Sequence, residues 1–184
     1  QERYGVVPDL AAYGKTISGG YPLAAVCGRA DIMSLADPRR RAEPDFVFVS
    51  GTTNGNPVAT TAGLATLDEL EKEGVYPRLY DTAKNLRQGL EERARALDIP
   101  FQVIGEGPVL EPVFGRDPIR TYADGLNADA GARRRFSVEL LRRGIFVSGQ
   151  KIYLSLAHTQ EDVAHTLEVA AEAFEAARAT PANP

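Results

Sequence analysis

Hydrophobic and polar positions alternate in two ways along this chain, and each way predicts a different kind of element. Short, continuous apolar runs rich in β-branched and aromatic residues predict strands. Longer segments, in which apolar residues recur every three or four positions, predict helices, because one helical turn takes 3.6 residues. Strand-like and helical segments follow one another through the sequence, so we expect an α/β fold.

The first part of the chain is expected to hold three strands and two helices. The predicted strands are Leu10–Tyr13, Leu23–Cys27 and Phe46–Val49. The second strand is apolar throughout, without polar alternation, and is therefore expected to be buried. The predicted helices are Ala30–Leu35, ended by the Asp37-Pro38 pair, and Pro57 to about Lys72, stopped by Gly74 as a left-handed cap.

From Tyr76 onward we expect a helix, strands, a second helix, strands and a closing helix. The first helix presents one apolar face, formed by Leu79, Ala83, Leu86, Leu90 and Ala94. Two strand pairs are expected, Phe101–Ile104 with Val109–Phe114 across Gly105–Pro108, and Ile145–Val147 with Ile152–Leu156 across Ser148–Lys151.

The closing helix has a recognisable start. The Thr159 hydroxyl is expected to cap it, while Asp162 supplies the carboxylate of a capping box. Its core face is expected to consist of Val163, Leu167, Ala170 and Phe174. Residues 179–184 are expected to form a disordered tail.

Composition and charge narrow the class of protein. The 184 residues are 43% hydrophobic and 25% charged, so the chain can bury a substantial core. The net charge is −4, and the arginine clusters Arg39–Arg41 and Arg133–Arg135 are too short to make nucleic acid a partner. No apolar run reaches the roughly 18 residues of a membrane span, and no signal peptide opens the sequence. We therefore expect a cytoplasmic protein with no membrane partner.

The single cysteine, Cys27, excludes an internal disulfide. It is expected to pack as a small apolar side chain. The cysteine content is therefore compatible with a reducing compartment.

The segment Asp9–Pro22 carries the first sign of chemistry. Lys15 lies there on a glycine-flanked turn directly after an apolar run. A protonated amine is a poor nucleophile, so lysine chemistry at neutral pH requires desolvation, nearby cations or a carbonyl partner that holds it as a Schiff base. The surrounding glycines leave room for a bulky planar cofactor. An exposed turn lysine is the competing interpretation.

The segment Gly51–Pro57 carries a second sign. Small hydroxyl and amide residues run into a predicted helix, with Asn56 as N-cap and Pro57 as first helical residue. The free amides and the positive end of the helix dipole there suit a phosphate. An ordinary turn and cap explains the same residues, so this segment alone decides nothing.

Several motifs occur together in a fixed order. They are Pro8-Asp9-Leu10, Gly14-Lys15, Gly19-Gly20, Pro22-Leu23, Gly28-Arg29, Gly51-Thr52, Gly55-Asn56-Pro57, Ala62–Leu67 and Leu154–Thr159. By these motifs the chain resembles the C-terminal part of a class III aminotransferase that depends on pyridoxal 5′-phosphate (PLP), nearest the glutamate-1-semialdehyde 2,1-aminomutase-like branch. The match spans most of the chain.

The resemblance implies a fold, a site and a reaction. The fold is the type I PLP-dependent transferase fold, with residues 1–75 in the large domain and 76–178 as the small C-terminal α+β domain. Lys15 is then the residue that forms the internal aldimine, and Thr52 reaches the cofactor phosphate of the neighbouring subunit in a homodimer. The implied enzyme moves an amino group between a small-molecule donor and a carbonyl acceptor.

The resemblance also exposes missing parts. Before the position of Gln1, family members carry a phosphate loop, an aromatic residue stacked on the cofactor ring and an aspartate bound to the ring nitrogen. None of these has a counterpart here. We therefore expect a fragment, or a truncated product, of a family that is catalytic when whole.

Two rival functions stay open. An intramolecular aminomutase reaction is favoured by Ser155–Thr159, but the stretch before it is shortened to Ser148–Tyr153, which favours a transaminase with another substrate. A non-catalytic truncated folding unit is the second rival.

The remaining polar candidates have ordinary explanations. His158 and His165 lack accompanying metal ligands at suitable spacing, so we expect no metal site and structural roles for the histidines. Gln150 and Lys151 occupy positions where family members vary the residues that face the substrate. A solvated hairpin lysine is the favoured interpretation of Lys151.

Overall fold

A computed structural model describes residues 1–147 and 151–178 of the chain. The chain divides after Glu73 into two compact units, of which unit 1 is Gln1–Glu73 and unit 2 begins at Gly74. Each unit is described by itself. None of the helices within these ranges has the length and apolar composition of a membrane span.

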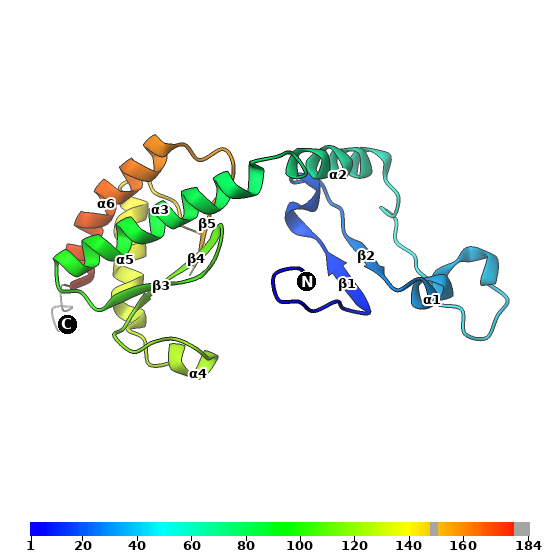
Figure 1. Ribbon diagram of the computed structural model, residues 1–184, viewed down its shortest axis with the longest axis horizontal. Helices are drawn as coiled ribbons and strands as arrows, with labels where there is room; N and C mark the ends of the chain where they lie inside the picture. Colours follow the sequence, from blue (N-terminus) through cyan, green and yellow to red (C-terminus); the bar gives the residue numbers. More distant parts are fainter. Residues whose placement is uncertain (148–150, 179–184) are drawn as a thin grey trace. The chain divides into compact units, whose positions relative to one another are not determined.

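Unit 1 is built on a two-stranded antiparallel sheet and one long helix (Figure 1). Its elements are strands β1 (Leu10–Tyr13) and β2 (Ala25–Gly28), helices α1 (Ala30–Met33) and α2 (Pro57–Leu70), and 3-10 helices at Lys15–Ser18, Ser34–Ala36 and Pro38–Arg40. The register pairs Leu10 with Gly28 and Tyr13 with Ala25. The helix α2 packs against the 3-10 helix Lys15–Ser18.

Three expectations for unit 1 are wrong. The strand predicted from Leu23 begins at Ala25 and is largely exposed, and so is Cys27. The reason is that, within the described residues, β2 belongs to a sheet of only two strands, with β1 as its partner. The segment Phe46–Val49 forms no strand, because no strand pairs with it within the described residues; Phe46 N–H donates to Glu43 O at 3.2 Å and Val47 N–H to Leu35 O at 2.8 Å.

The apolar side chains of unit 1 are mostly exposed. The buried residues among the first 73 are Ser18, Ala59 and Gly63. Phe48 and Val49 are 69% and 65% exposed. Local hydrogen bonds and the packing of α2 on one turn therefore hold this unit together, rather than a hydrophobic core.

Unit 2 is an α+β arrangement of one sheet and packed helices. Its strands are β3 (Phe101–Glu106), β4 (Val109–Phe114) and β5 (Ile152–Tyr153), and its helices are α3 (Val75–Ala96), α4 (Tyr122–Gly125), α5 (Ala130–Arg142) and α6 (Gln160–Arg178). The sheet order is β3-β4-β5, antiparallel throughout. Helix α6 packs against both α3 and α5 (Figure 1).

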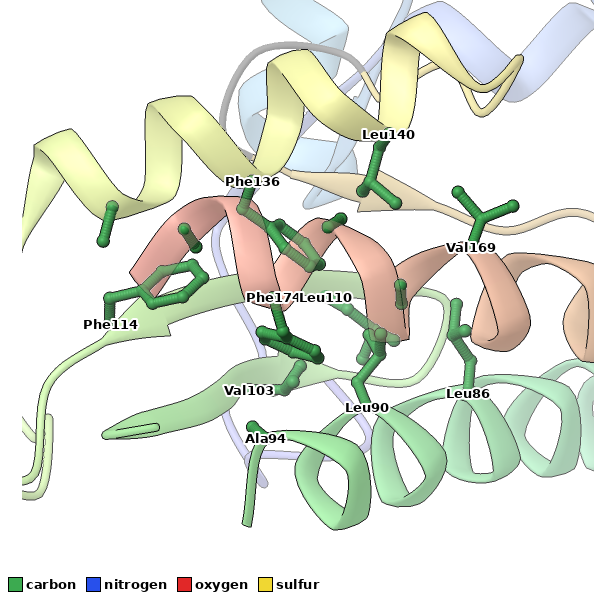
Figure 2. Close-up of a cluster of buried hydrophobic side chains, with 14 of the residues drawn as sticks. Leu86, Leu90, Ala94, Val103, Leu110, Phe114, Phe136, Leu140, Val169 and Phe174 are labelled. Atoms are coloured by element: carbon green, nitrogen blue, oxygen red, sulfur yellow. The ribbon is translucent and has the colours of Figure 1, made fainter. Parts of the chain in front are cut away.

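The core of unit 2 gathers side chains from all three long helices and from β3 and β4 (Figure 2). Phe174 of α6 is fully buried, with its ring centroid 4.6 Å from that of Phe136 and 4.8 Å from that of Phe101. Phe114 completes this aromatic cluster, 5.5 Å from Phe136. The apolar faces predicted for α3 and α6 are confirmed, since Leu86, Leu90, Ala94, Val163, Ala170 and Phe174 are buried.

The strand predictions for unit 2 are confirmed in one pair and wrong in the other. The hairpin of β3 and β4 forms as expected. The segment Ile145–Val147 is not a strand, because β5 pairs with β4 instead, placing Ile152 opposite Leu110. Ile145 and Val147 pack against the core as loop residues. Ser148–Gln150 of the predicted turn and the predicted tail 179–184 lie outside the described residues.

One of the predicted helix ends is confirmed and another is wrong. Thr159 N–H donates to Asp162 Oδ2 at 2.8 Å, and Asp162 N–H donates to Thr159 Oγ1 at 3.1 Å, which confirms the predicted capping box. Gly74 is left-handed, with φ 81°. It is the N-cap of α3 and not the cap that ends α2, because α2 stops at Leu70 with Glu71 as its C-cap, so the predicted stop of this helix at Gly74 is wrong.

Candidate functional site

Lys15 lies at the first position after the extended Gly14 that follows β1. Its backbone has φ 57°, in the left-handed region that residues with a side chain seldom occupy. Within the described residues, one other non-glycine residue, Asp98, has a positive φ. The Lys15 side chain is exposed, and its amine forms no hydrogen bond or ion pair with any described residue. The primary amine is therefore available to a ligand.

The turn that presents Lys15 is fixed by contacts on its inner side. Ser18 is completely buried and its hydroxyl donates to Tyr21 O. Gly19 ends the 3-10 helix with φ 59°, and its N–H donates to Thr16 O at 3.2 Å. The lysine therefore stands on a turn whose other side is anchored.

Helix α2 supplies the surface beneath this turn. A Cβ on Gly63 would lie 2.6 Å from Leu23 Cδ2 and 3.7 Å from Ile17 O. A Cβ on Gly19 would lie 3.2 Å from Thr66 Oγ1. The turn can thus approach α2 closely because Gly19 and Gly63 have no side chains. The sequence motif did not reveal this supporting role of the two glycines.

An ion-pair cluster ties the start of β1 to α1. The Arg29 guanidinium contacts Asp9 Oδ1 at 2.7 Å and Asp31 Oδ2 at 2.6 Å. Hydrogen bonding to Asp31, and then to Asp9, raises the pKa of Arg29, and the bond from Arg29 lowers the pKa of Asp31. The Gly28-Arg29 motif therefore has a structural function, since it orients the strand that leads to Lys15.

Thr52 lies on the exposed loop before α2. No hydrogen bond or ion pair links it to Lys15 in the part of the chain that the structure describes. The hydroxyl is free to contact a ligand or another chain. Its role stays a prediction.

The first amides of α2 are already satisfied. Asn56 Oδ1 accepts from Val58 N–H at 3.0 Å and from Ala59 N–H at 3.1 Å. Pro57 has no N–H, and Thr60 N–H donates to Asn56 O. The predicted N-cap is confirmed, but it occupies the amides that we expected to be free for a phosphate. Thr52 and the helix dipole remain as the features of this segment that suit an anion.

The other polar candidates have structural positions. His158 Nδ1 accepts from Ser155 N–H at 3.0 Å, which closes the turn before α6. Lys151 is exposed beside β5. Across residues 1–147 and 151–178, no group of three or more His, Cys, Asp and Glu side chains is arranged to hold a metal ion.

Comparison with known proteins places this geometry in a family. The model of the family "Aminotransferase class-III" matches residues 1–169. The chain is 37% identical over 179 residues to the glutamate-1-semialdehyde 2,1-aminomutase of Sorangium cellulosum, covering 96% of this chain and 40% of that protein. The chain thus spans about 40% of the length of the curated relatives it matches.

Solved structures of similar proteins agree with this family match. An omega-transaminase from Sphaerobacter thermophilus superimposes with a TM-score of 0.85 at 32% identity, over 97% of this chain and 41% of that one. The FumI protein of Sphingopyxis sp. MTA144, solved in its PLP internal aldimine form, gives a TM-score of 0.77 at 27% identity, over 95% and 38%. The expected fold class is confirmed over the matched portion, and the chain belongs to the class-III aminotransferase family.

Proposed function

We propose that this chain carries the lysine-bearing part of a PLP-dependent aminotransferase, with Lys15 as the amine that holds the cofactor. The observation that carries the proposal is the backbone of Lys15. A left-handed conformation costs an L-residue about 1–2 kcal/mol, and glycine would remove the cost. Retaining lysine at a strained, exposed position between anchored residues is typical of a functional site.

The residues present fit this cofactor. The Lys15 amine is unengaged, and the exposed Thr52 hydroxyl is a donor for a phosphate, which we assign to the cofactor of the neighbouring subunit. PLP, when bound, supplies a carbonyl group for amines and an electron-withdrawing ring. The family membership and the cofactor of the Sphingopyxis relative support the same assignment.

Lys15 then has two tasks. Its neutral amine attaches the cofactor, and when a substrate amine displaces it, Nζ is free to take a proton from the substrate carbon and return it to a neighbouring atom. The anchored turn keeps Nζ within a limited volume during both tasks. The proposed substrates are a small-molecule amino donor and a carbonyl acceptor.

The proposed assembly is a cytoplasmic homodimer with the cofactor site at the subunit interface. Residues 1–75 are assigned to the large domain and 76–178 to the small one. The exposed apolar side chains of unit 1, such as Phe48 and Val49, support contact with further polypeptide.

The test is a spectrum of the purified chain with PLP, before and after borohydride, followed by peptide mass spectrometry. The chain has four lysines, Lys15, Lys72, Lys84 and Lys151, so labelling can be assigned completely. We expect a visible band and a reduced adduct on Lys15, both absent in Lys15→Ala and retained in the control Lys84→Ala. Label spread evenly over all four lysines would contradict the assignment.

An intramolecular aminomutase reaction is the second candidate. Its support is the identity to the Sorangium aminomutase. Once a cofactor-loaded protein is obtained, product analysis separates the two, because a transaminase needs a separate acceptor and a mutase returns the amine to the same molecule. A protein that never acquires the Lys15 adduct would instead support a non-catalytic folding unit.

A further inference from the structure

Unit 2 contains a pocket that the proposed reaction does not use. Its volume is about 530 Å³, within the range of about 300–1,000 Å³ that small-molecule sites occupy. Ile104 and Glu111 lie opposite each other across β3 and β4. They point away from the helical core, because their chain neighbours Val103 and Leu110 belong to that core.

The other walls come from the segment after β4. Figure 1 shows this segment carrying α4 and leading into α5. It contributes the apolar residues Ile119, Tyr122 and Leu126, of which Tyr122 is 86% and Leu126 67% exposed. The pocket is therefore lined on one side by a sheet face and on the other by apolar side chains that no packing partner covers in this unit.

Two opposite charges face each other in this pocket. Arg133 of α5 places a guanidinium nitrogen 3.7 Å from Glu111 Oε1, and the two side chains are only 24% and 25% exposed. This distance is too long for a hydrogen bond. Neither side chain forms another hydrogen bond with a described residue. The donors of Arg133 and the acceptors of Glu111 are therefore largely unused.

The remaining acids near the pocket are already engaged. Asp129 Oδ1 accepts from Ala132 N–H at 2.8 Å at the start of α5. Asp124 Oδ2 accepts from the backbone N–H groups of Arg120 and Thr121. Arg120 also lines the pocket but is exposed, so Arg133 and Glu111 are the half-buried charged pair that a ligand would meet.

We propose that this pocket binds a zwitterionic α-amino acid with an apolar side chain. Its carboxylate pairs with Arg133, its ammonium with Glu111, and its side chain lies against Ile104, Tyr122 and Leu126. A simple anion would be repelled by Glu111 and a simple cation by Arg133, whereas a molecule that carries both charged groups on one carbon atom satisfies both side chains. The site consists of unit 2 residues alone and includes neither Lys15 nor Thr52.

Calorimetric titration of the full chain, without added cofactor, tests the proposal with three related probes. L-phenylalanine carries both charges, 3-phenylpropionate lacks the ammonium and phenethylamine lacks the carboxylate. We expect L-phenylalanine to bind about tenfold or more tightly than either analogue, since each analogue leaves one of the two charged side chains without its partner. Equal affinity for all three probes, or no heat with L-phenylalanine, would overturn the proposal.

Variants assign the two charges. In Arg133→Gln, L-phenylalanine should no longer bind more tightly than phenethylamine. In Glu111→Gln, it should no longer bind more tightly than 3-phenylpropionate. Arg134→Gln, on the exposed neighbouring position of α5, is the matched control and should bind as the wild type does. An equal loss in Arg134→Gln would refute the assignment.

Two further variants keep the test decisive. If circular dichroism shows that a charge variant does not fold, Ile104→Trp fills the half-buried wall instead and should abolish binding. Lys15→Ala should leave binding unchanged, so a failed cofactor assignment at Lys15 does not affect this result. Binding lost in Lys15→Ala, or retained in Ile104→Trp, would place the amino acid elsewhere.

Discussion

Replacing Lys15 with glycine should make the protein more stable while it removes the proposed function. At φ 57° the L-residue carries an unfavourable energy of about 1–2 kcal/mol, which glycine does not. Glycine loses more backbone entropy on folding than alanine, a cost of about 0.5–1 kcal/mol. Lys15→Gly should therefore be more stable than Lys15→Ala by about 0.5–1 kcal/mol, because alanine keeps the strain.

The comparison of the two variants isolates the backbone, since both lack the amine. Hydrogen exchange at Gly19 N–H, which is bonded to Thr16 O, reports the opening free energy of this turn. We expect slower exchange in Lys15→Gly than in Lys15→Ala. Asp98→Gly, at φ 52° outside the site, should gain less stability than Lys15→Gly, because aspartate tolerates this region better and because the ion pair of Asp98 with Arg116, at 3.3 Å, is lost as well.

Faster exchange at Gly19 in Lys15→Gly than in Lys15→Ala would refute the strain argument. Neither variant should acquire a borohydride adduct at position 15. A gain in stability together with loss of the adduct would mean that this position keeps lysine for its chemistry, against its effect on folding.

Three further predictions concern stability. Phe174→Ala should lower the free energy of unfolding by about 3–5 kcal/mol, because the ring is fully buried among three other phenylalanines. Urea unfolding followed by near-UV circular dichroism measures this loss, and a loss below about 1 kcal/mol would show that the cluster is not closely packed. Gly105→Ala should destabilise the hairpin more than Gly144→Ala, measured by the same unfolding curves: both glycines have positive φ, but a Cβ at Gly105 would lie 2.3 Å from Val109 O and one at Gly144 meets nothing within 4 Å. Hydrogen bonds from the Thr159 N–H and hydroxyl lower the pKa of Asp162, so its contribution is complete above the unfolded value of about 3.9 and is lost as pH falls through the lower folded value. The difference in melting temperature between wild type and Asp162→Asn should accordingly shrink as pH is lowered from 6 to 2, and a constant difference would contradict this.

The sequence predicted best those features that depend on nearby residues. The apolar faces of α3 and α6 follow from a helical period, and the cap at Thr159 from two residues three positions apart. The pairing of segments that are distant in the sequence was harder to predict. Phe46–Val49 has the composition of a strand but no partner strand. Ile145–Val147 was expected to pair with the strand that begins at Ile152, but that strand, β5, pairs with β4.

The candidate site shows the same limit. The lysine was recognisable from its motif, but its left-handed backbone was not, because glycine is the residue that usually signals such a conformation. Asn56 was identified as a cap, yet its side chain serves two amides at once and leaves neither to a phosphate. Arg133 and Glu111 lie 22 positions apart, and no local pattern indicates that they meet.

The position of α6 has a consequence for the order of folding. This helix packs against both α3 and α5, and its residues Ala170 and Phe174 are fully buried. The contacts between α3 and α6 join segments separated by most of unit 2, so they close slowly and late. During synthesis α3, β3, β4 and α5 must leave the ribosome before the helix that covers their apolar faces exists. Until α6 emerges, these faces are open to aggregation, and unit 2 is expected to need protection at this stage.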